Sequence, residues 1–198
     1  MSGGWVSLSA MRTTTLILTA LAALLSWPAR AGTGLEGTYW ERAAALADVA
    51  PSVLYGIACQ ETHARWDDGS DRPWPWTLTV NRGVRGGNAV AAGPRRFNSR
   101  PEAEKALLDF LRAGVRDIDV GLMQVNLRWH GHRVESPRQL LDPRTSLAVA
   151  AAILREAWGG SASLRQAVGR YHSRQAARGQ VYADRVLRYA RRLEDGRR

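Results

Sequence analysis

Apolar residues recur at helical spacing in residues 39–50 and again in residues 51–63. The second stretch begins with proline, which suits the first turn of a helix. Val53, Leu54 and Ile57 follow at the spacing of a largely buried helix, and polar residues gather only at its C-terminal end. The pattern therefore predicts two consecutive helices, the second of which delivers polar side chains from the core to the surface.

The remaining helices are expected further along the chain. Ser99-Arg100-Pro101-Glu102 is a capping-box sequence, and Asp142 can cap a helix that begins at the next residue. The expected helices are residues 99–112, 136–141, 143–158 and 181–193, with a short helix beginning at Ser161.

Residues 67–97 have a different character, with Gly, Pro, Trp and short alternating runs. Residues 76–80 and 88–92 are expected to form a β-hairpin, and Gly121 is expected to open a short helix. The predicted fold class is therefore mainly α, an α+β fold with a helical core and a small β-hairpin excursion.

The N-terminus has the layout of a secretory signal peptide. Arg12 precedes an apolar run, and Pro28-Ala29-Arg30-Ala31 offers a cleavage site with small residues. An uncleaved anchor is the alternative, although the run is short for a membrane span. We expect a signal peptide over residues 1–31, one domain over residues 32–198, and no transmembrane helix after cleavage.

The chain carries a formal charge of +10, and Lys105 is its only lysine. With 45% hydrophobic residues the composition is that of a globular protein, not a disordered one. A basic surface favours nucleic acid, anionic lipid or an acidic cell wall. Export and the absence of a nucleic-acid reader motif favour the wall or the membrane, so no nucleic-acid partner is expected.

Neither the cysteine nor the histidines have a metal-binding pattern. Cys59 lies in an apolar helical stretch and is expected to be a buried, inert thiol. The four histidines lack the spacing of known zinc motifs, so we expect no metal site and no cofactor.

Glu61 is the principal candidate for catalysis. It stands at the C-terminal end of a buried helix, where both burial and the helix dipole raise the pKa of a carboxyl group. A carboxyl group that is neutral near pH 7 can protonate a poor leaving oxygen such as that of a glycosidic bond.

Three segments of the chain stand out. They are IACQETH at residues 57–63, DVGLMQVN at residues 119–126 and AVGRYHS at residues 167–173. Their order and content resemble the lysozyme-like lytic transglycosylases, the group of soluble lytic transglycosylases and goose-type lysozymes. In that family a helix ends in Glu-Ser, a Gly-Leu-Met-Gln motif follows, and an Ala-Tyr-Asn segment closes the cleft. Here Thr62 replaces the serine and His172 the asparagine. The chain is similar in particular to small transglycosylases that accompany conjugation and secretion machines.

The resemblance implies a periplasmic enzyme with a lysozyme-like domain that cleaves the MurNAc–GlcNAc β-1,4 bond of peptidoglycan and leaves 1,6-anhydro ends. Glu61 would act as general acid and then as base, without metal or organic cofactor. Components of a conjugation or secretion machine are further partners that the resemblance implies. The substrate-binding residues that carry over are Thr62, Met123, Gln124, Asn126 and Tyr171.

Several of these roles have alternatives. Gln124 and Asn126 could bridge their own loop, Met123 could belong to the core, and Tyr171 could bond Glu61 or the substrate or simply pack. Asp119 is the first candidate for a water-activating base, with an N-cap as the more favoured reading. One or two of four tryptophans are expected to stack on sugars: Trp66, Trp74, Trp76 and Trp129.

Two other functions remain open. A hydrolytic muramidase would cut the same bond with water and would need a second carboxylate. A non-catalytic module that binds the wall and helps an assembly would need no catalytic acid.

Overall fold

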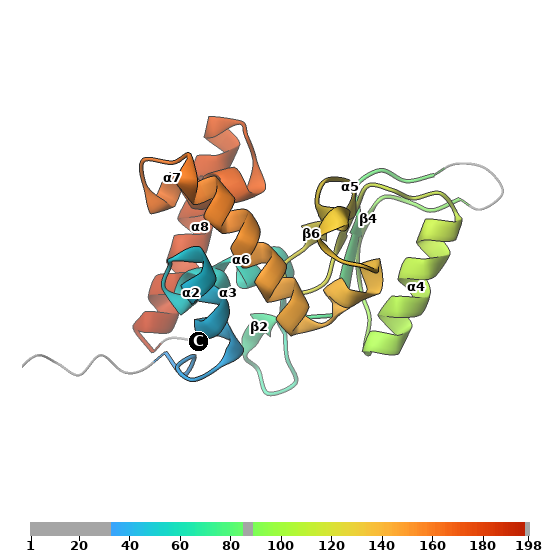
Figure 1. Cartoon of the computed structure of the whole chain (residues 1–198). Helices are drawn as coiled ribbons and strands as arrows, with labels where there is room; N and C mark the ends of the chain where they lie inside the picture. Colours follow the sequence, from blue (N-terminus) through green and yellow to red (C-terminus); the bar gives the residue numbers. More distant parts are fainter. Residues whose placement is uncertain (1–32, 85–88, 197–198) are drawn as a thin grey trace, which may run out of the picture. The chain divides into compact units, whose positions relative to one another are not determined.

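The computed structural model describes residues 33–84 and 89–196, which belong to one compact unit, Gly32–Arg198. This part of the chain contains seven α-helices and two small antiparallel sheets (Figure 1). The predicted fold class, mainly α with a small β region, is confirmed. The signal peptide expected over residues 1–31 lies outside the described residues.

Five helices form the helical part of the unit and pack in pairs, α3 on α8, α7 on α8, α2 on α6 and α6 on α7 (Figure 1). Their bounds are α2 Tyr39–Ala47, α3 Pro51–Thr62, α6 Pro143–Gly159, α7 Leu164–His172 and α8 Ala176–Glu194. Leu54 and Ile57 of α3 are fully buried, as their spacing predicted. Gly56 allows α8 to approach closely, because a Cβ there would lie 2.5 Å from the carbonyl oxygen of Val186. At this point α3 and α8 therefore pack with their backbones in contact, without a side chain between them.

The caps expected from the sequence are present. The Ser99 side chain accepts a hydrogen bond from the backbone N–H of Glu102 and begins α4, Arg100–Arg112. Asp142 caps α6 in the same way. The expected helix at residues 136–141 is the 3₁₀ helix η2, Pro137–Leu141. The last helix begins at Ala176, earlier than the expected residue 181. Its added first turn includes Gly179, which packs directly against Gly169 of α7.

The larger sheet has the strand order β4-β3-β5-β6, with every neighbouring pair antiparallel. Its strands are β3 Thr77–Val80, β4 Gly93–Arg96, β5 Ile118–Val120 and β6 Val125–Asn126. A smaller sheet pairs β1, His63–Arg65, with β2, Asp71–Pro73.

The expected return strand of the hairpin was wrong. Thr77 pairs with Arg96 and Val80 with Gly93, so the return strand is residues 93–96. Of the expected range, the described residues 89–92 contribute only an isolated antiparallel bridge from Val90 to Val84. The sequence obscured it because Gly93 and Pro94 are usual strand breakers. Pro94 is tolerated because β4 is an edge strand, which needs no N–H on its outer side.

The short helix expected to begin at Gly121 was also wrong. Gly121 and Gln124 have positive φ angles of 78° and 46° and lie in a tight turn between β5 and β6. A Cβ on Gly121 would lie 2.0 Å from the carbonyl oxygen of Leu140, so only glycine fits there. Helix α5, Leu127–His130, starts after the turn and is followed by the 3₁₀ helix η1, Gly131–Arg133.

Within the described residues, no single helix is long and apolar enough to cross a membrane. Together α2 and α3 would reach that length, but the chain bends by 102° between them.

Candidate active site

Glu61 occupies the penultimate position of α3 and lines a cavity of about 500 Å³. Helix α8 forms the opposite wall, and His172 at the end of α7 closes one side. The Tyr182 hydroxyl donates a 2.6 Å hydrogen bond to Oε1 of Glu61. The carboxyl group predicted from the sequence therefore lies at a cavity, half-buried and held by one named donor.

Burial raises the pKa of Glu61 from 4.5 to about 7. The hydrogen bond from Tyr182 opposes this rise, because it favours the charged carboxylate, whereas the charge of Asp119 adds to it. A substantial share of the Glu61 carboxyl group is therefore protonated at neutral pH, which suits a proton donor.

Tyr182 is a site residue that the sequence analysis missed. It is buried, and burial together with the charge of Glu61 raises its pKa well above the ordinary value, so it remains a neutral donor. The His172 ring stacks on it at a centroid distance of 4.4 Å and an interplanar angle of 2°. The available signal was the spacing of Tyr182 with Val186 and Ala190, which marks the buried face of α8.

Thr62 and Met123 are fully buried, so neither side chain offers a surface to a substrate in this conformation. The Thr62 hydroxyl lies 2.9 Å from the carbonyl oxygen of Ala58 and 3.1 Å from that of Leu122. It therefore ties the end of α3 to the turn between β5 and β6. We assign Thr62 and Met123 a positioning role beside Glu61.

Tyr171 anchors the same turn from α7. Its hydroxyl donates a 2.9 Å hydrogen bond to the carbonyl oxygen of Met123. Burial, with the charges of Glu61 and Asp119, raises the pKa of Tyr171 well above its ordinary value. The three segments singled out in the sequence thus converge, but Tyr182 rather than Tyr171 is bonded to Glu61.

The Gln124 side chain bridges its own loop. Its Oε1 accepts a 2.6 Å hydrogen bond from the Thr79 hydroxyl. Its Nε2 donates to the carbonyl oxygens of Thr77 and Gly121 at 3.1 and 2.8 Å. Both amide hydrogens are therefore used, which leaves Gln124 with little free capacity for a sugar.

The Asn126 side chain is equally engaged. Its oxygen caps α5, and its nitrogen donates to Asp117 and Asp119 at 2.9 and 2.7 Å. Asn126 therefore orients Asp119 and is not free for an acetamido group in this arrangement.

Asp119 lies in the middle of β5, so the favoured reading of this residue as an N-cap was wrong. The cap is Asn126, seven residues later. Asp119 also accepts a 2.8 Å hydrogen bond from Asn81. Burial raises its pKa, while the two amide donors oppose the rise. Asp119 is not among the residues that line the Glu61 cavity, but it is near enough for its charge to raise the pKa of Glu61.

Of the four candidate tryptophans, only Trp129 is largely exposed, at 64%. Trp66 and Trp74 have ring centroids 4.9 Å apart, and Trp74 meets Trp76 edge-on at 6.1 Å. These three stabilise the region around β2 and β3, whereas Trp129 retains a face that could stack on a sugar.

Cys59 is buried, and burial raises the pKa of its thiol to about 12, so the thiol is unreactive near neutral pH. Across residues 33–84 and 89–196, no group of three or more His, Cys, Asp or Glu side chains is arranged to hold a metal ion.

The described part of the chain thus brings a proton donor, a second carboxylate and an exposed aromatic ring into one domain. No protein-family model matches this sequence, and neither the curated proteins nor the solved structures include a significant match.

Proposed function

We propose that this protein is a lytic transglycosylase that cleaves the MurNAc–GlcNAc β-1,4 bond of peptidoglycan. The observation that carries the proposal is the state of Glu61, a carboxyl group with a pKa of about 7 at the edge of a cavity of about 500 Å³. The resemblance of the three segments to lytic transglycosylases supplies the substrate class.

The two protonation states of Glu61 correspond to two steps. The protonated carboxyl group donates its proton to the glycosidic oxygen as the C1–O bond breaks. The C6 hydroxyl of the same muramic acid then attacks C1, assisted by the acetamido group. The Glu61 carboxylate removes the proton of that hydroxyl, which gives the 1,6-anhydro product and regenerates the acid. A pKa near 7 serves both steps, because donor and acceptor forms coexist at neutral pH.

Hydrolysis is the second candidate, and Asp119 favours it. A muramidase needs a carboxylate that activates water or attacks the sugar. Asp119 is the acid whose charge raises the pKa of Glu61. Against this, Asn81 and Asn126 each donate to one of its oxygens, so the carboxylate is already occupied in part.

We extend the proposal to the cellular setting: an exported, periplasmic enzyme that opens the wall for a conjugation or secretion apparatus. This part rests on the resemblance alone. A non-catalytic wall-binding module remains the alternative that retains the fold but not the chemistry.

The products decide among these functions. Purified protein is incubated with sacculi, and the soluble fragments are identified by mass spectrometry. Transglycosylation leaves 1,6-anhydro ends, which are lighter by one water molecule than the reducing ends left by hydrolysis. Reducing ends would show that the protein is a hydrolytic muramidase and not a transglycosylase. Intact sacculi would support the non-catalytic module.

A further inference from the structure

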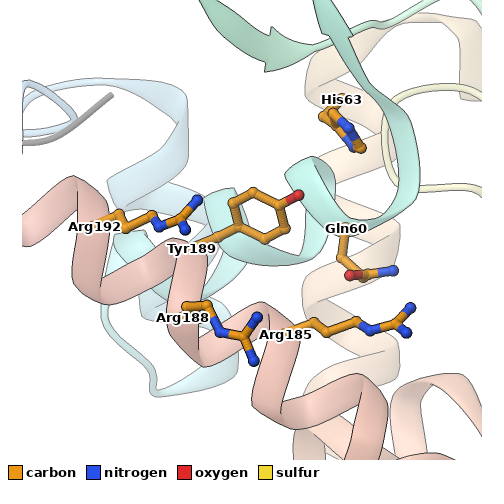
Figure 2. Close-up of a pocket in the computed structure, with 6 residues that line it drawn as sticks. All are labelled: Gln60, His63, Arg185, Arg188, Tyr189 and Arg192. Atoms are coloured by element: carbon orange, nitrogen blue, oxygen red, sulfur yellow. The ribbon is translucent and has the colours of Figure 1, made fainter.

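A groove of about 310 Å³ adjoins the Glu61 cavity along the seam between α3 and α8. Gln60 and His63 at the end of α3 line one side (Figure 2). The other side is formed by four residues of α8: Arg185, Arg188, Tyr189 and Arg192. Gln60 and Arg185 also line the Glu61 cavity, so the two hollows are neighbours that share these two residues. We call the first hollow the arginine groove.

Three guanidinium groups are concentrated in this groove. Arg185, Arg188 and Arg192 are spaced by three and four residues and therefore share one face of α8, and all three are exposed. Among the described residues, none of the three forms an ion pair, whereas Arg165 is paired with Asp184. Three positive charges without a counter-charge form an anion-binding surface.

An acid close to one end of the groove is already paired with another arginine. Asp71 lines the next hollow together with Arg192, but its ion pair is with Arg65, at 3.6 Å. The other titratable groups that line the groove are His63 and Tyr189, whose ring centroids lie 6.1 Å apart.

We propose that the arginine groove binds the free carboxylates of the peptides carried by the glycan, an inference that rests on the function proposed above. Because the two hollows share Gln60 and Arg185, the proposal puts the scissile sugar bond at Glu61 and the peptide branch in the arginine groove. The branch carries carboxylates, which guanidinium groups bind with paired hydrogen bonds. The substrate class is then peptide-bearing peptidoglycan in preference to bare glycan.

A membrane surface fits this groove less well. An interfacial helix needs large apolar side chains beside its basic ones. The large apolar residues exposed in the described part of the chain are Tyr39, Leu46, Trp129 and Val181. Only Val181 belongs to α8, and it does not line the arginine groove.

The kinetic test uses Arg188→Gln/Arg192→Gln, because these two arginines do not line the Glu61 cavity. The ratio of kcat/KM on peptide-bearing glycan to that on glycan stripped of its peptides is expected to fall about tenfold. Arg82→Gln/Arg191→Gln removes the same charge from exposed positions outside the groove and is expected to retain the wild-type ratio. Equal ratios for all three proteins would overturn the proposal.

A binding test separates this proposal from the catalytic one. The isolated wall peptide and its amidated form, which lacks free carboxylates, are titrated into wild-type protein and the groove variant. The acidic peptide is expected to bind the wild type at least about tenfold more tightly than the amidated peptide does, and the variant is expected to lose this preference. Equal binding of both peptides by the wild type would refute the groove assignment even if glycan is cleaved. A clear preference without cleavage would instead refute the catalytic proposal.

Discussion

Tyr182 and Glu61 lie 121 residues apart in the chain, yet the Tyr182 hydroxyl donates a 2.6 Å hydrogen bond to Oε1 of Glu61. Burial drives the carboxyl group toward its neutral form, and this bond draws it back toward the charged one. The pKa of about 7 is the balance of the two effects, together with the charge of Asp119.

Tyr182→Phe removes the donor that favours the charged form, so the pKa of Glu61 is expected to rise. Because the protonated acid starts the reaction, the alkaline limb of the kcat/KM–pH profile is expected to move to higher pH. The measurement is glycan cleavage from pH 5 to pH 9. A limb that stays in place or moves to lower pH would show that the bond does not control the acid.

Asp119→Asn removes a negative charge that raises the pKa of Glu61, so the alkaline limb is expected to move to lower pH. Under transglycosylation the maximal rate is expected to fall by less than about tenfold, because the substrate supplies its own nucleophile. Loss of a catalytic base would instead cost about 100-fold to 10,000-fold. A fall in that range, measured at the optimum pH of each protein, would favour hydrolysis.

The raised pKa of Glu61 also predicts how stability depends on pH. The folded protein retains the proton up to about pH 7, whereas the unfolded chain releases it near 4.5. Folding therefore loses stability as pH rises between these values, by at most about 3 kcal/mol. Glu61→Gln removes this loss and can still accept the bond from Tyr182.

The stability of Glu61→Gln relative to wild type is therefore expected to be greater at pH 8 than at pH 5. Urea unfolding at the two pH values measures it. An equal difference at both pH values would mean that the carboxyl group titrates as it does in the unfolded chain.

Gly56→Ala places a Cβ against the backbone of Val186, which cannot move without shifting α8. The variant is expected to lose about 1–3 kcal/mol of unfolding free energy and much of its activity, because Tyr182 lies on the same helix. Gly159→Ala is the matched control, since a Cβ at that helical position meets no atom within 4 Å. Thermal unfolding of both variants checks the prediction, and similar stability for the two would contradict it.

The sequence was sufficient for those parts of the fold that local patterns determine. Helix α3 was found because buried positions recur at helical spacing after Pro51. Helices α4 and α6 were found because Ser99 and Asp142 have the chemistry of caps. Glu61 followed from the same reasoning, since its position at the end of a buried helix is a local property.

The parts that failed depend on tertiary contacts. The strand at residues 93–96 contains glycine and proline, and its place at the sheet edge cannot be read from the sequence alone. The turn at Gly121 depends on the close approach of Leu140. Tyr182 was missed because its partner is far away in the chain. For Gln124 and Asn126 the sequence left both substrate contact and internal bridging open, and it could not name the internal partners that the structure shows.

The central claim is that Glu61 supplies the proton that breaks the glycan. The most direct measurement is the rate at which Glu61→Gln releases soluble fragments from sacculi, compared with wild type, alongside the binding of both proteins to sacculi. The account predicts a fall in rate of at least about 1,000-fold with binding retained. A variant that still clears sacculi at a rate within about tenfold of wild type would contradict it.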